Sequence, residues 1–174
     1  MMRRLVGSEM CIRDSLAREV VKGAKKNLKK RKASGKLQRS IKSNVKVNPK
    51  SFELDFEMEG YGQYQDAGVD GKKKRYGKRK AGLPTFSYKD KMPPPKSLDK
   101  WVVRKGLKGT RDTKGRFVGR KALTFIIARS IFMKGLEPTY FFTDAFQAAY
   151  KKLPKEFIDK YELDIDNFLK FTTK

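Results

Sequence analysis

Residues 52–59 read FELDFEME, and this stretch decides the fold class of the chain. Apolar residues at even positions alternate with acidic residues at odd positions, which predicts a strand with one face on a core and an acidic face outward. Upstream, Val45 and Val47 alternate with Lys46, and the NPKS stretch at 48–51 is typical of a turn. We therefore expect an antiparallel β-hairpin around 44–59, with Lys46 and Lys50 near the acidic row.

Helical periodicity flanks the hairpin on both sides. Apolar residues recur at helical spacing over 16–28 with basic residues between them, and a short helical turn around 37–41 follows. The next predicted helix, 98–105, has Ser97 as its cap and Trp101 and Val102 facing inward. Another covers 122–131, stops at Gly135 and is the best candidate for a buried helix.

A last helix opens at Thr143 or Asp144, presents Ala145, Phe146 and Ala149 on its inner face, and is broken or restarted at Pro154. The fold class predicted from these patterns is α+β. A small antiparallel sheet, the hairpin around 44–59, is packed by about four helices.

The length of 174 residues favours one domain. Residues 1–15 read MMRRLVGSEMCIRDS, and VGSEMCIRDS resembles translated adapter sequence that recurs at the ends of unrelated metagenomic reading frames. The alternative is a frayed tail, and both readings leave 1–15 outside the fold as a non-native or disordered tail. A single α+β domain is then expected over 16–174, with an extended basic loop at 69–97.

Charge is unevenly distributed along the chain. The formal net charge is +24, from 43 Lys and Arg against 19 Asp and Glu. Residues 1–50 contain 16 basic and 3 acidic side chains, and residues 71–121 contain 19 and 3, whereas 122–174 are nearly balanced with 8 and 7. Such a field attracts polyanions or an acidic partner surface.

The densest basic stretch is KKKRYGKRK at 72–80. Its cations form a candidate site for a polyanion or a partner: Lys72, Lys73, Lys74, Arg75, Lys78, Arg79 and Lys80. One reading is salt-dependent, sequence-independent binding of DNA or RNA phosphates. The other is a solvated loop that becomes ordered only against an acidic protein.

No catalytic, cofactor or metal site is expected. The chain has no histidine, and its single Cys11 can form neither an internal disulfide nor a cysteine-based zinc site. The acidic row at 53–59 is explained by a solvated strand face, and no nucleotide-binding or hydrolase fingerprint occurs. We predict that the protein is not an enzyme. No apolar run reaches the ~20 residues of a membrane helix, so no membrane partner is expected.

Aromatic residues are the other candidates for contacts. In a small protein they act more often as core or interface anchors than as platforms for nucleic-acid bases. The candidate anchors are Tyr61, Tyr64, Trp101, Tyr140, Phe141 and Phe142.

Five short segments follow one another in a recognisable order. They are SGKLQRSI at 34–41, YGQYQDAG at 61–68, WVVRKG at 101–106, IARSIFMKG at 127–135 and PTYFF at 138–142. In order and spacing, from about 16 to 149, the chain resembles the tail-completion (head–tail joining, or neck) proteins of tailed bacteriophages. The basic 69–97 stretch is longer than is expected for that family.

This resemblance implies a small α+β virion protein without an active site, assembled in the cytoplasm of the host bacterium. It implies a homo-oligomeric ring between head and tail, other neck and tail proteins as partners, and a position in which DNA contact is conceivable. A different class of function stays open beside it: a sequence-independent nucleic-acid-binding protein that uses the basic loop.

Overall fold

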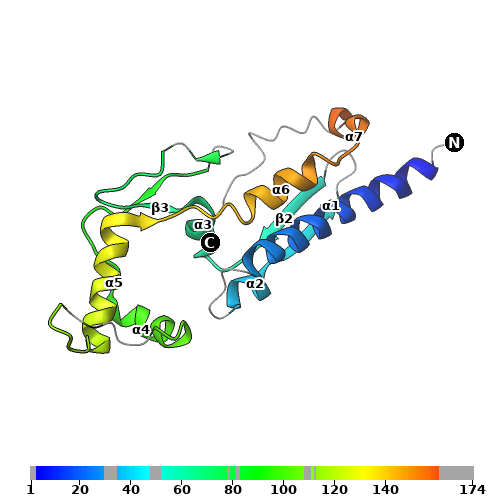
Figure 1. Ribbon diagram of the computed structural model, residues 1–174. Coiled ribbons are helices and arrows are strands. Elements are labelled where there is room, and N and C mark those ends of the chain that lie inside the picture. Colours follow the sequence, from blue (N-terminus) through cyan, green and yellow to red (C-terminus); the bar gives the residue numbers. More distant parts are fainter. Residues whose placement is uncertain are drawn as a thin grey trace.

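The computed structural model describes residues 3–29, 35–47, 52–77, 79–80, 83–107, 111 and 113–160. It has two parts (Figure 1). The main body contains α1 (Arg3–Lys29), α2 (Lys36–Ser40), β1 (Lys42–Val47), β2 (Phe52–Glu57), α6 (Thr143–Tyr150) and α7 (Lys155–Lys160). The second part, called the arm below, contains β3 (Val69–Asp70), β4 (Phe86–Ser87), α4 (Pro95–Arg104), α5 (Arg120–Lys134) and β5 (Gly135–Leu136), and α3 (Gly62–Ala67) joins the two parts. The α+β class is confirmed.

The predicted hairpin is present. β1 and β2 pair antiparallel with Val45 opposite Leu54 and Lys46 opposite Glu53. Lys46 Nζ lies 3.1 Å from Asp55 Oδ2 and 3.5 Å from Glu53 Oε2, as expected from the alternation. Hydrogen bonding and charge from Asp55, with a smaller effect of Glu53, raise the pKa of Lys46. Lys50 and the turn at 48–51 lie outside the described residues.

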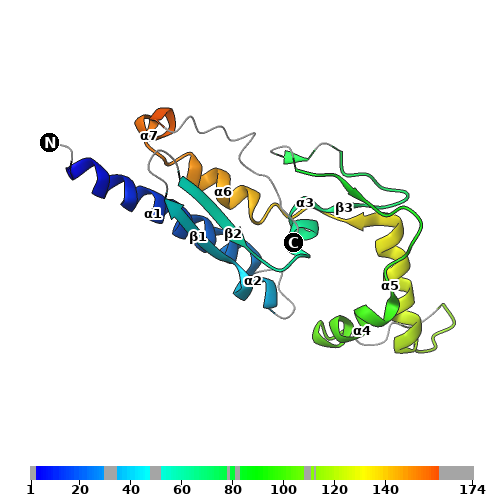
Figure 2. The same cartoon turned by 180° about the vertical axis from the view of Figure 1, so that it is seen from behind.

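The core lies where α1 and α6 cross one face of the hairpin (Figures 1 and 2). The helical spacing of Ala145, Phe146 and Ala149 gives α6 the inner face that the sequence predicts, and all three are buried. The ring of Phe56 on β2 meets the ring of Phe142 edge-on, with centroids 5.1 Å apart. The remaining buried members of this cluster are Leu16, Val20, Ala24, Leu28, Leu37, Ile41, Phe141 and Tyr150.

The first helix is longer than the sequence suggests. α1 begins at Arg3, so residues 3–15 continue the helix that was expected from residue 16. Arg13 is buried, whereas Met10 and Cys11 are exposed. The structure differs here from the frayed-tail reading, because a helix that is already nucleated by packing extends through a segment without proline. The adapter reading concerns the origin of the segment and stays a prediction.

The described residues of 71–85 and 88–94 have no α-helix or strand, as a long basic loop predicts, but the stretch at 69–97 also contributes two short strands, β3 and β4. β3 lies between β4 and β5, parallel to the first and antiparallel to the second, and Val69, Asp70 and Leu83 are buried. These strands have two residues each, so they are too short to produce visible alternation. Two glycines allow the backbones to approach closely at this sheet. A Cβ at Gly71 would lie 2.3 Å from Met133 O, and a Cβ at Gly135 (φ +76°) would lie 2.1 Å from Val69 O.

The arm helices depart from prediction at three points. α4 begins at Pro95, so Ser97 lies in the first turn, where its Oγ donates to Pro94 O instead of capping the helix. Proline suits this position, because its missing N–H needs no partner there. Val102 is buried as expected, but Trp101 is 37% exposed.

α5 ends before Gly135 as predicted, but it is not a well-buried helix: only Thr124 and Ala128 are buried. The arm projects from the main body, and α5 packs chiefly against α4 (Figures 1 and 2). No helix in the described part of the chain combines the length and apolar content needed to span a membrane.

Candidate functional site

Two of the segments behind the phage resemblance meet in space. Within α3, the Gln65 carbonyl accepts hydrogen bonds from Thr139 N (3.1 Å) and Thr139 Oγ1 (2.8 Å). The Asp66 carbonyl accepts one from Tyr140 N at 3.1 Å. The stretch at 61–68 therefore holds the backbone of the stretch at 138–142 and fixes where α6 begins.

Asp66 completes this junction with its side chain. Oδ1 accepts hydrogen bonds from the backbone N–H of Phe142 (2.8 Å) and Thr143 (3.4 Å), and Oδ2 accepts one from Thr143 Oγ1 at 2.5 Å. The residue that precedes α6 is Phe142, which has no capping side chain, so Asp66 caps the helix from another element. Burial raises the pKa of the Asp66 carboxyl, and the hydrogen bonds from Thr143 and Phe142 oppose that rise.

The role of Asp66 is not predicted from the sequence. An acid in a Gly- and Tyr-rich stretch resembles an ordinary polar loop residue. The available signal was indirect: an α6 that opens without a good cap in front of Thr143 needs an acceptor from elsewhere in the fold.

The candidate basic cluster is divided by the structure. Lys72, Lys73, Lys74 and Arg75 are exposed. Arg79 is different: its side chain is 1% exposed, and its Nη2 donates to Asp70 Oδ1 at 2.6 Å. Two further nitrogens of Arg79, Nε and Nη1, are buried and have no hydrogen-bond partner among the described residues.

Lys80 belongs to the junction more than to the basic cluster. Its Nζ lies 3.1 Å from Asp144 Oδ1 and 4.7 Å from the ring centroid of Tyr140, which adopts a positive φ of 48°. Lys78 lies outside the described residues. Of the described cations in the 72–80 stretch, Arg79 therefore has a buried side chain, whereas Lys80 stays exposed although it pairs with Asp144.

The aromatic candidates also separate into two groups. Phe141 and Phe142 are core residues, each 2% exposed. Tyr61 and Tyr64 are exposed, although the Tyr64 ring lies 4.5 Å from that of Phe86 on β4. Large apolar side chains are also exposed along the arm, a feature that sequence periodicity missed. They are Trp101, Val103, Leu107, Phe117, Phe125, Ile126 and Leu136.

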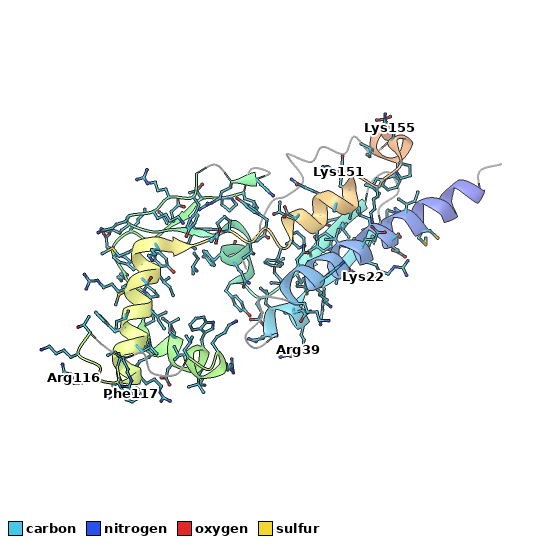
Figure 3. The ribbon with its side chains drawn as sticks, viewed as in Figure 1. Lys22, Arg39, Arg116, Phe117, Lys151 and Lys155 are labelled. Carbon is cyan, nitrogen blue, oxygen red and sulfur yellow. The ribbon has the colours of Figure 1, made fainter. Side chains whose placement is uncertain are left out.

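The arm surface mixes these apolar side chains with basic ones. Figure 3 shows Phe117 and Arg116 at the end of the arm farthest from α7, and Phe117 is 71% exposed. The guanidinium of Arg111 lies 4.7 Å from the Phe117 ring centroid. An exposed apolar surface on a projecting element is typical of a protein–protein contact.

A groove of about 570 Å³ runs between α1 and α6, lined in part by Glu19, Asn27 and Asp144. Its carboxylates are paired: Glu19 with Lys152 at 3.0 Å and Asp144 with Lys80. Among the described residues, no three Cys, Asp or Glu side chains gather in a way that would hold a metal ion.

Comparison of the chain with protein-family models, with curated proteins and with solved structures gives no match.

Proposed function

We propose that this protein is a structural subunit of a tailed-phage virion, a head–tail joining component that acts by assembling into a ring. Its partners are further copies of itself and other neck and tail proteins. The proposal assigns no catalytic step and no cofactor. It draws on the order of the five sequence segments and on their arrangement, because the stretches at 61–68 and 138–142 form one hydrogen-bonded junction.

One observation supports it most: the arm projects from the main body and exposes Phe125 (48%) and Ile126 (54%) on α5. A monomer gains nothing from a helix whose apolar side chains remain in water. A neighbouring copy placed against the arm buries them. Where the arm of one copy packs against the main body of the next, the contact is heterologous, and a heterologous contact closes into a ring when its rotation closes.

The test is the oligomeric state of the full chain, measured by size-exclusion chromatography with light scattering over a range of salt and protein concentrations. We expect a discrete multimer that appears as a ring in electron micrographs. A chain that stays monomeric at all concentrations and in high salt would contradict ring assembly.

The matched variants are F125S with I126S on the arm, and M10S on α1, which is 51% exposed. Only the arm double variant is expected to dissociate the multimer, with unchanged circular dichroism and thermal midpoint. Equal dissociation by M10S would place the contact elsewhere and would argue against the arm.

A further inference from the structure

The four exposed cations at 72–75, called the basic turn below, lie on a fixed backbone. Gly71 N donates to Lys74 O at 2.9 Å and closes the turn. Lys72 N and Lys73 N donate to the carbonyls of Phe132 and Met133, at 3.0 and 2.9 Å. These carbonyls belong to the last turn of α5, where carbonyls lack partners within the helix. The basic turn is therefore seated on the end of α5.

The far end of the turn is held as well. Asp70 Oδ1 accepts hydrogen bonds from Tyr76 N at 2.9 Å and from Arg79 Nη2 at 2.6 Å. One buried carboxylate therefore holds the segment that follows the basic turn. Lys74 Nζ lies 4.8 Å from the Tyr76 ring centroid, and the Arg79 guanidinium 5.7 Å from it. The segment that resembles a flexible basic loop in sequence is a turn fixed at both ends.

Little in the described chain neutralises the basic turn. Lys72 Nζ lies 3.9 Å from Asp90 Oδ1, an 89% exposed side chain, and this is the turn's one ion pair among the described residues. The carbonyl end of α5 has a partial negative charge, which favours cations at this site. It does not pair with their charged groups, which still face solvent. Consecutive positive charges are thus displayed to solvent.

We propose that the basic turn is a preorganised phosphate-binding site for double-stranded DNA. Each cation placed against the duplex backbone releases condensed counterions, which gives sequence-independent affinity. Because the backbone of the turn is already ordered by its hydrogen bonds to α5 and Asp70, binding loses less conformational entropy than it would for a disordered arm. The inference does not depend on ring assembly.

The composition of the turn favours a duplex over other anionic partners. Protein interfaces are depleted of lysine at their cores, and Lys72, Lys73 and Lys74 have no exposed apolar residue among them. Single-stranded nucleic acid is held largely by stacking on aromatic side chains. The aromatic residue here, Tyr76, is half-buried, with Lys74 and Arg79 over its ring.

The first experiment compares two variants with the same charge change. One replaces residues 72–75 by serine (K72S, K73S, K74S and R75S). The control replaces four exposed lysines further along the chain (K89S, K91S, K96S and K100S). Affinity for a short labelled duplex is measured by fluorescence anisotropy between about 50 and 200 mM salt, where phosphate contacts dominate.

We expect the turn variant to bind at least about tenfold more weakly, and its slope of log affinity against log salt to flatten by up to about 3.6, at about 0.9 for each phosphate that the variant no longer neutralises. The control should keep the wild-type slope. Equal weakening in the two variants would mean that net charge alone attracts DNA, and unchanged binding in the turn variant would leave an acidic protein as the ligand; either result overturns the proposal.

Preorganisation is tested without changing charge. G71A places a Cβ 2.3 Å from Met133 O and displaces the turn from α5, whereas a Cβ at Gly119 meets nothing within 4 Å. We expect weaker DNA binding for G71A and wild-type binding for G119A. The same affinity in both, with G71A still folded by circular dichroism, would overturn the preorganised geometry. Multimer formation is followed in parallel, so failure of DNA binding and failure of ring assembly are read separately.

Discussion

Asp66 Oδ2 accepts a 2.5 Å hydrogen bond from Thr143 Oγ1, although 77 residues separate the two in the chain. The whole arm lies between them. This contact and the two backbone hydrogen bonds to Asp66 Oδ1 fix the point at which the chain returns from the arm and begins α6.

Replacing Asp66 by alanine should therefore destabilise the main body. The substitution leaves the buried N–H of Phe142 and Thr143 and the Thr143 hydroxyl without their acceptor. We expect a loss of about 3 kcal/mol in the free energy of unfolding, measured by urea denaturation. D144A is the control: its ion pair with Lys80 is exposed, so about 0.5 kcal/mol is expected. Equal effects would show that Asp66 does not cap α6.

The raised pKa of Asp66 also predicts a pH dependence. The folded state holds the proton of this carboxyl more tightly than the unfolded state, whose ordinary value is 3.8. The contribution of Asp66 to stability is therefore full below pH 3.8 and falls as pH rises through the raised folded pKa. In D66N, which has no charge to desolvate, the decline should be absent. The difference in unfolding free energy between wild type and D66N is measured against pH, and a difference that is flat across the acid range contradicts the pKa direction.

The ion pair of Asp70 and Arg79 should stabilise the arm locally. D70A leaves the nearly inaccessible guanidinium of Arg79 uncompensated, which costs about 3–5 kcal/mol for a buried pair. Hydrogen exchange should therefore accelerate at the amides of β3 and β5 and not at those of α1. D90A, which removes only a long, exposed contact with Lys72, should leave exchange unchanged. Uniform acceleration across the chain would indicate that arm and main body unfold together.

Salt should act on the two proposed activities with opposite signs. Copies with a net charge of +24 repel one another, and added salt screens that repulsion, so the multimer should become tighter as salt rises. The DNA complex should weaken over the same range. Truncating Phe125 and Ile126 should raise the dissociation constant of the multimer at least tenfold, about 1–2 kcal/mol for each anchor, at every salt concentration. Sedimentation velocity with and without duplex measures both trends, and a multimer that dissolves in high salt would contradict an apolar contact.

The sequence predicts the main body well and the arm poorly. In the hairpin and in α6, periodicity and burial agree, because each element has one apolar face and one solvated face. In α5 the apolar residues lie on several faces, so the sequence predicts a helix that is buried all round. In the structure α4 covers one side of α5, and apolar residues on other sides stay exposed. The two-residue strands β3, β4 and β5 are defined by backbone partners distant in sequence, which no local pattern records.

The candidate site shows the same division. Runs of cations are visible in the sequence, and Lys72, Lys73, Lys74 and Arg75 are exposed as predicted for such a run. Arg79, in the same run, is buried against Asp70, and only the tertiary fold distinguishes it from its neighbours. The capping role of Asp66 was not predicted because its partners, Phe142 and Thr143, are far away in sequence.

The contact between α1 and the residues just before α6 has a consequence for synthesis on the ribosome. Asn27 of α1 donates a hydrogen bond to the carbonyl of Phe141, 114 residues later in the chain. At about 5–20 residues per second, the apolar face of α1 emerges several seconds before the helix that covers it. During that interval the nascent chain exposes Val20, Ala24 and Leu28 while the whole arm is being translated. The main body therefore completes its core late, only after the arm has been translated.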